Sequence, residues 1–248
     1  MAGAPWDSAR ANSGGAQRHP AMVRVTHWIT ALCFFTLLVS GVQIVISHPR
    51  FYWGETGNVR TPALFQIPIP ASRAAVQTGY GYVLPDQNGW SRALHFQSAW
   101  AVVIAGVLYG VFGMRTGHFR RRLLPAAGDL APSSLARAVA NHARFRLRDG
   151  DPSAYNVLQR LAYLGVIFVL FPFLIWTGLA MSPGFTAAFP ATVTTLGGQQ
   201  SARTLHFFTS LAVVAFAGIH VAMVAITGFQ DRMRAMITGR ASTQEEHP

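Results

Sequence analysis

The chain has 248 residues, of which 51% are hydrophobic and only 12% are charged. Soluble globular domains carry roughly 25% charged residues, so this composition excludes an ordinary water-soluble domain. The formal net charge is +11, and all 20 basic residues are arginine. A nucleic-acid-binding protein can carry such a charge, but here the arginines follow the ends of hydrophobic segments instead of forming one patch.

Four segments contain no Asp, Glu, Lys or Arg, at residues 25–46, 93–114, 161–181 and 205–228. Each reaches the roughly 20 residues that a helix needs to cross a bilayer. We therefore expect an all-α fold, a transmembrane four-helix bundle occupying residues 21–231, with helices at about 21–46, 91–114, 155–181 and 202–228. A flexible N-terminus (1–20) and a C-terminal tail (232–248) flank this domain.

The arginines predict the orientation of the bundle. They precede the first segment, fill the connection between the second and third, and follow the fourth. Residues 47–89, after the first segment, hold only Arg50, Arg60 and Arg73, and residues 182–201 hold none. The positive-inside rule thus predicts that both termini and the central connection are cytoplasmic. The first twenty residues lack an apolar core, so we interpret the first helix as an uncleaved anchor.

The outer connection at residues 47–89 is long and rich in proline and aromatic residues, and proline opposes regular helix there. Two interpretations are open: a packed docking surface for a partner protein, or an aromatic belt at the lipid headgroups, equally plausible for Trp53 and Trp90. Pro172 predicts a kink in the third helix. Residues 184–200 are too short to span and predict an outer hairpin connection.

Cys33 is the only cysteine, which excludes an intrachain disulfide and a Cys-ligated cluster. Nine histidines are present, and His27, His95, His206 and His220 lie in the hydrophobic segments. A single such histidine would be explained by packing between helices. Four of them indicate function, because ionisable groups in a membrane are costly. The other five lie in tails or loops, and we assign them no role: His19, His48, His118, His142 and His247.

The spacing of the four histidines predicts two pairs. His206 and His220 are 14 residues apart, about 1400° of rotation, which puts them within roughly 40° of one helix face at depths about 21 Å apart. His95 starts the second helix on the outer side and matches His206 in depth. His27 lies near the inner start of the first helix and matches His220, more closely if that helix begins at Pro20.

Two bis-histidine pairs stacked across a bilayer are typical of a cytochrome b with two stacked haems. Gly41 lies 14 residues beyond His27, and Gly106 lies 11 beyond His95, so each is close to its histidine's helix face. We expect Gly41 to make room for the outer haem and Gly106 for the inner one. An alternative is that Gly106 and Gly110 form a G-x-x-x-G helix contact.

The leading function is electron transfer by two non-covalent haems b. No nucleophile–base pair is evident and no span contains an acidic residue, so we expect an electron-transfer subunit without its own site for substrate chemistry. A His-relay proton or solute transporter without haem is the alternative, although internal repeats are not evident. A third interpretation is a membrane anchor without cofactor.

Five motifs connect the chain to a known family. They are R-V-T-H-W at 24–28, H-P-R-F-Y-W-G at 48–54, Y-N-V-L-Q-R-L-A-Y at 155–163, T-G-L-A-M-S-P-G at 177–184 and S-A-R-T-L-H-F at 201–207. With these motifs the chain resembles the bacterial cytochrome b561 and nickel-hydrogenase b-type subunits over nearly all of residues 22–240. Within this family it resembles the thiosulfate-reductase-type cytochrome b subunit.

The resemblance implies two haems b held by one histidine from each of the first two helices and two from the fourth. It implies a bacterial inner (plasma) membrane protein that passes electrons between membrane quinone and a periplasmic oxidoreductase, in this branch often a molybdopterin enzyme. The related formate dehydrogenase cytochrome b has a Y-N-x-x-Q run at its quinone site. By that resemblance Tyr155, Asn156 and Gln159 are the expected quinone-binding residues, although Leu158 stands where the relative has a quinone-contacting glycine.

Overall fold

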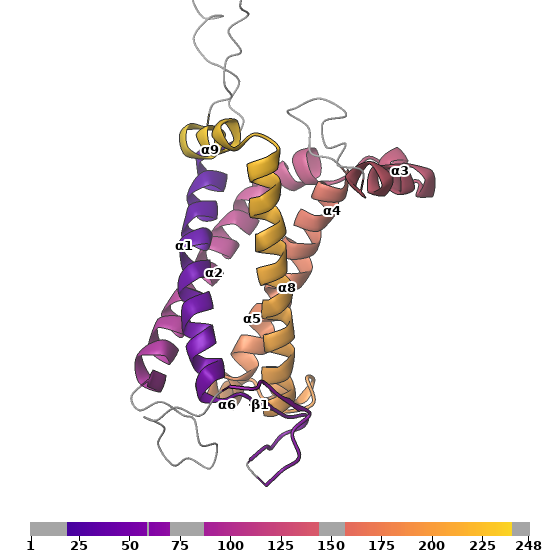
Figure 1. Cartoon of the computed structure of the whole chain (residues 1–248). Coiled ribbons are helices and arrows are strands. Elements are labelled where there is room, and N and C mark those ends of the chain that lie inside the picture. Colours follow the sequence, from indigo (N-terminus) through magenta and orange to yellow (C-terminus); the bar gives the residue numbers. More distant parts are fainter. Residues whose placement is uncertain (1–18, 59, 70–86, 144–156, 240–248) are drawn as a thin grey trace, which may run out of the picture.

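The computed structural model describes residues 19–58, 60–69, 87–143 and 157–239. Four helical spans among them are long and apolar enough to cross a membrane. They are α1 (Ala21–Ser47), α2 (Gln87–Thr116), a third span made of α4 (Val157–Gly165), η4 (Val166–Leu170) and α5 (Phe171–Ala180), and α8 (Gln199–Ile226). Figure 1 shows the spans as one upright bundle, which confirms the predicted all-α transmembrane architecture.

The third span is distorted beside its proline. Pro172 is the second residue of α5, and the five residues of η4 directly before α5 form a π-helical turn. Proline lacks an N–H and its ring collides with the carbonyl four residues earlier. Such a turn is a known way for a helix to absorb a local break in its hydrogen bonding. The helix type thus changes directly before Pro172, at the place where the sequence predicts a kink.

The bundle has an apolar surface, and many small hydroxyl side chains are buried in its interior together with apolar ones. Large side chains such as Leu32, Phe35 and Val39 are exposed on the surface of the isolated chain, where lipid would cover them. Small hydroxyl side chains are buried between the helices. They are Thr26, Ser40, Ser47, Ser91, Ser98, Thr177, Ser201, Thr204 and Thr209. Small residues allow close helix approach and hydroxyls bond across helices, which is how helices associate where the solvent is lipid.

The four spans form two close pairs. The backbones of α1 and α2 pack together along their lengths, and α5 packs against α8. The hydroxyls of Thr36 on α1 and Ser98 on α2 are hydrogen-bonded to each other, with their oxygens 2.8 Å apart. In Figure 1, α1 and α2 lie on one side of the bundle and α5 and α8 on the other. The interior between the two pairs is therefore lined by side chains from different parts of the chain.

One end of the bundle, which we call the hairpin end, is covered by a short sheet and two short helices. Strands β1 (Arg50–Phe51) and β2 (Phe65–Gln66) pair antiparallel, and α6 (Pro183–Ala188) and α7 (Ala191–Thr194) follow the third span. Figure 1 places β1 and α6 at this same end. Residues 48–58 and 60–69 of this proline-rich connection form no helix, as the sequence predicts, and α2 already begins at Gln87.

The segment after α1 is fixed to the start of α8. The carbonyl of Gly54 accepts from the backbone N–H groups of Gln200 and Ser201 at 3.0 and 3.2 Å, and Gln199 N donates to Glu55 Oε2 at 3.2 Å. The first N–H groups of a helix have no partner inside it and favour negative charge. This segment therefore satisfies the α8 N-terminus.

Side chains of α8 strengthen the same attachment. Thr204 Oγ1 donates to the carbonyl of Tyr52 at 2.7 Å, and the guanidinium of Arg203 donates to the carbonyl of His48. Phe51 stacks on Phe65 with ring centres 4.6 Å apart and contacts Phe207 at 4.5 Å. The motifs at 48–54 and 201–207 are thus two halves of one contact.

The opposite end, which we call the α9 end, carries α9 (Phe229–Thr238), and also η2 (Phe119–Leu123), η3 (Ala127–Leu130) and α3 (Pro132–Ala143). Gly228, with φ of 114°, separates α8 from α9. Arg24 and Trp28 of α1 donate to the carbonyls of Ile237 and Met236 at 2.5 and 3.0 Å. These carbonyls belong to the last turn of α9, which has no helical partners for them. The packed structure thus extends past residue 231, where we expected the tail to begin.

Gly198 offers a test of the hairpin-end attachment. Its φ is +112°, and an added Cβ would lie 2.6 Å from the backbone carbonyl group of Gly54. Gly54 also has a positive φ of +100°, but an added Cβ there meets nothing within 4 Å. Gly54→Ala should cost about 1–3 kcal/mol from backbone strain alone, whereas Gly198→Ala should cost more because it also displaces the attached segment. Thermal unfolding in detergent measures both; equal destabilisation would contradict the clash.

Candidate functional site

The first histidine pair lies toward the hairpin end, between the two helix pairs. His95 comes from α2 and His206 from α8. Their ring centres are 6.2 Å apart and the rings are inclined by 63°. The structure thus brings together the two histidines that the sequence analysis matched by depth.

Each ring of this hairpin-end pair contacts a buried hydroxyl on the neighbouring helix. Ser40 Oγ of α1 lies 3.0 Å from His95 Nδ1, and Thr177 Oγ1 of α5 lies 3.0 Å from His206 Nδ1. Both hydroxyl-bearing residues have zero exposure. The contacts fix how each imidazole is rotated and direct the opposite ring nitrogen, Nε2, away from the supporting helix.

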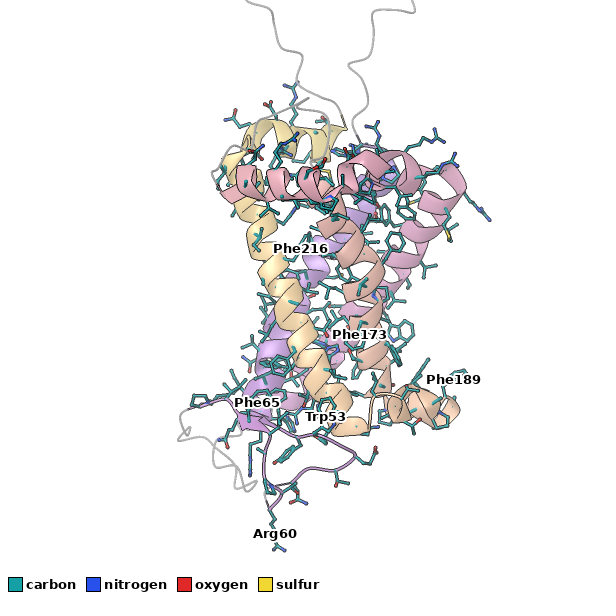
Figure 2. All side chains as sticks on the ribbon, turned by 90° about the vertical axis from the view of Figure 1, so that its right-hand side faces the viewer. Trp53, Arg60, Phe65, Phe173, Phe189 and Phe216 are labelled. Carbon is teal, nitrogen blue, oxygen red and sulfur yellow. The ribbon has the colours of Figure 1, made fainter. Side chains whose placement is uncertain are left out.

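The second pair lies toward the α9 end. The ring centres of His27 on α1 and His220 on α8 are 6.3 Å apart, with the rings inclined by 58°. Phe216, one turn before His220 on α8, stacks on it with a centre-to-centre distance of 5.9 Å; Figure 2 shows Phe216 in the half of the bundle nearer α9. The Trp28 ring meets His27 edge-on at 5.3 Å. Aromatic rings thus surround this pair.

The separation within both pairs suits two imidazoles that share one metal ion. With roughly 2 Å from metal to nitrogen and about 1.2 Å from nitrogen to ring centre, the ring centres would lie about 6.4 Å apart. His27 Nδ1 is also buried without a hydrogen-bond partner among the described residues. Isolated buried polar atoms are costly, so the pairs fit a metal-centred group better than they fit empty packing.

The donor set indicates which kind of metal group fits. Within the described ranges, no three His, Cys, Asp or Glu side chains gather closely enough to hold a bare metal ion. Two histidines without further protein ligands would suit a metal group that supplies most of its own ligands, and haem is such a group.

Glycines lie beside the hairpin-end histidines. A Cβ on Gly41 would lie 3.6 Å from His95 Cε1, and one on Gly178 would lie 3.4 Å from His206 Cε1. Gly41 therefore lies beside the hairpin-end pair, which is the pair that the sequence predicts to be the outer one. A Cβ on Gly106, which shares the His95 face by helical rotation, would meet no protein atom within 4 Å. The same holds for Gly110, so neither glycine makes a close contact with another helix among the described residues, and the G-x-x-x-G alternative gains no support there.

Comparison with known proteins now identifies the family. The model of the family described as prokaryotic cytochrome b561 matches residues 18–239. The chain belongs to this family. A curated protein of Azospira oryzae, named putative protein-methionine-sulfoxide reductase subunit YedZ1, is 29% identical over 213 residues, covering 84% of this chain and 90% of that protein. No solved structure matches.

Membership of the cytochrome b561 family confirms the resemblance stated from the motifs. It makes this chain a haem b protein of the membrane that transfers electrons. The alternatives without cofactor, a His-relay transporter and a bare anchor, do not agree with this assignment.

The residues expected at the quinone site are only partly placed. Tyr155 and Asn156 lie outside the described residues. Gln159 lies in α4, four residues before Tyr163 and so on the same helix face. The Tyr163 ring lies 6.3 Å from that of His220. Tyr163, the last residue of the motif at 155–163, thus lies beside the α9-end pair.

Two loop histidines without an assigned role are partly enclosed. Burial, followed by Arg203 and Arg92, lowers the pKa of His48. Burial and the nearby Arg122 lower the pKa of His118, whose ring lies among Tyr109, Phe112 and Phe119. Neither histidine belongs to a pair, and both favour the neutral form.

Sequence reasoning missed Ser40, Thr177 and Gly178. The last two belong to the motif at 177–184, to which we had assigned no chemistry. The motif at 177–184 contains no charged residue and no histidine. Its place among the family motifs was nevertheless a signal that these positions have a specific packing role in the third span. The structure supplies the constraint, which is contact with His206.

Gly178 generates a test of this packing. Gly178→Ala should be tolerated, because its methyl would make an ordinary 3.4 Å contact with His206 Cε1. Gly178→Leu should displace the imidazole and reduce haem b per protein, measured from the pyridine haemochrome spectrum. Gly165→Leu is the matched control in the same span, because a Cβ there meets nothing within 4 Å. Equal haem content in the two leucine variants would refute the assignment.

Proposed function

We propose that the chain is a dihaem cytochrome b that passes electrons between membrane quinone and an oxidoreductase outside the membrane. The observation that carries the proposal is the presence of two separate histidine pairs with nearly the same ring separation, 6.2 and 6.3 Å. His95 and His206 would hold one haem b, and His27 and His220 the other. A bound haem b supplies reversible one-electron chemistry at its iron.

The protein's own residues determine where this chemistry takes place. α8 presents His206 and His220 at depths about 21 Å apart, which divides the crossing of the bilayer into shorter electron transfers. Histidine provides strong axial ligands, and apolar surroundings with aromatic rings such as Phe216 exclude water and thereby tune the potential.

The distribution of charge supports an orientation with the α9 end in the cytoplasm. Described arginines near that end include a run in η2, and α9 adds Arg232 and Arg234. Since short cytoplasmic loops are enriched in arginine and lysine, the hairpin end would face the periplasm and both termini the cytoplasm of a bacterial inner membrane. Residues 1–18 and 240–248 lie outside the described part of the chain, so the cytoplasmic location of the two termini stays a prediction.

The hairpin end would receive the partner enzyme. The attachment to α8 holds residues 48–58 in a fixed position at the hairpin end, which is the end nearer to His95 and His206. Two large apolar side chains of this connection are exposed there, Trp53 by 58% and Leu64 by 59%. Figure 2 shows Arg60 projecting furthest from this end. The Azospira oryzae relative is named a putative protein-methionine-sulfoxide reductase subunit. Together with the family resemblance, this favours a periplasmic, molybdopterin-dependent reductase as the partner.

The quinone would bind near the α9 end. Gln159 supplies an amide on the helix face that leads to Tyr163 and His220. Such groups can bond the carbonyl oxygens of a quinone headgroup, and Tyr155 and Asn156 directly precede them in the chain. The quinone would then exchange electrons directly with the haem held by His27 and His220.

The dihaem proposal is tested by counting haems. Purified wild-type protein should contain two haems b, whereas His95→Ala and His27→Ala should each retain one, because each removes a single axial ligand. Pyridine haemochrome analysis gives the count, and His118→Ala is the control that should keep both. One haem in the wild type, or two in either ligand variant, would contradict the assignment.

The quinone site is tested separately with Asn156→Ala and Gln159→Ala. Both should slow the reduction of the α9-end haem by a quinol, or its oxidation by a quinone, while leaving the haem spectra intact. Stopped-flow absorbance at the alpha band follows this reaction. Unchanged kinetics in both variants would place the quinone elsewhere, and a lost haem would instead make the residue structural.

A further inference from the structure

The two hydroxyls beside the hairpin-end histidines occupy equivalent positions in the two helix pairs. Ser40 belongs to α1, which packs against the helix that carries His95, and Thr177 belongs to α5, which packs against the helix that carries His206. The third span contains no histidine among its described residues, so Thr177 is its direct contribution to this pair.

The other hydrogen bonds of these hydroxyls determine which nitrogen carries the proton. Ser40 Oγ lies 2.6 Å from the carbonyl of Thr36, and Thr177 Oγ1 lies 3.0 and 2.9 Å from the carbonyls of Phe173 and Leu174. A hydroxyl has one proton and two lone pairs. Since a carbonyl only accepts, the hydroxyl proton is used there, and the oxygen accepts from histidine Nδ1–H. Nε2 then keeps its lone pair for a metal.

The α9-end pair is built differently. His27 Nδ1 is buried without a hydrogen-bond partner in the described part of the chain. The neighbouring hydroxyl of Thr26 bonds back to the carbonyls of Met22 and Val23 within its own helix. Other buried hydroxyls of the spans, such as Ser47 and Thr209, also bond back to the preceding turn. Bonding back is therefore common, and contact with a histidine is the feature that distinguishes Ser40 and Thr177.

We propose that Ser40 and Thr177 are positioning residues that fix the tautomer and orientation of His95 and His206 and lower the reduction potential of the haem they hold. A partner that accepts from Nδ1–H makes an imidazole more basic toward its metal. A more basic ligand stabilises the oxidised iron, so the hairpin-end haem is the more difficult of the two to reduce. This inference rests on the proposed dihaem function.

A redox titration of the purified cytochrome tests the inference. Ser40→Ala and Thr177→Val remove the hydroxyl acceptors and leave the backbone carbonyls of Leu37 and Leu174, which also bond to these two imidazoles. Each variant should raise one midpoint potential while the other stays constant. The expected change is about tenfold in the reduction equilibrium, the lower end of effects known for such supporting partners, which is ~59 mV for one electron. The redox transition that is missing from the titration of His95→Ala is the one that belongs to the hairpin-end haem.

Conservative variants and matched controls separate positioning from simple packing. Ser40→Thr and Thr177→Ser keep a hydroxyl and should retain the wild-type potential. Ser47→Ala and Thr209→Val remove buried hydroxyls that bond back in the same way but, among the described residues, bond to no histidine, so they should leave both potentials unchanged. Loss of the hairpin-end haem in Ser40→Ala or Thr177→Val, with retention in the conservative variants, would also support positioning.

Two outcomes would overturn the inference alone. One is a wild type with two haems whose potentials do not change in Ser40→Ala and Thr177→Val, and the other is an equal change in the control variants. A wild type with fewer than two haems would overturn the dihaem function itself, so the two failures are distinguishable.

Discussion

The structure depends on the face that α8 presents to the first two helices. Two imidazoles on that face lie within 6.2 and 6.3 Å of imidazoles from α2 and α1. Polar rings in a membrane interior are costly unless they have partners, and these rings meet across the boundary between the two helix pairs. The backbones pack closely within each pair, whereas histidines connect one pair with the other.

The position of α8 along the membrane normal is set at both of its ends. At the start, Gly54 and Glu55 satisfy N–H groups that a helix cannot satisfy itself. At the other end, Gly228 turns the chain into α9, whose last carbonyls accept from Arg24 and Trp28. The two histidines of α8 are thus held at fixed depths by contacts that involve no histidine of the pairs.

Hydroxyl side chains have a double role in this bundle. They allow the helices to approach closely, since they are small and bond to their own backbone. At Ser40 and Thr177 the same groups also reach an imidazole. A membrane protein can in this way orient a ligand without introducing a charge, which a carboxylate in that position would do at high cost.

The sequence by itself determined the number of spans, the depth of each histidine and the pairing, because hydrophobic length and a rise of 1.5 Å per residue act locally. The family followed from short motifs that are visible in the chain. Only the tertiary structure decided that the motif at 48–54 binds the one at 201–207, that α9 returns to α1, and that Thr177 reaches His206. Those contacts join residues far apart in sequence, and helical periodicity does not specify which faces of two different helices meet.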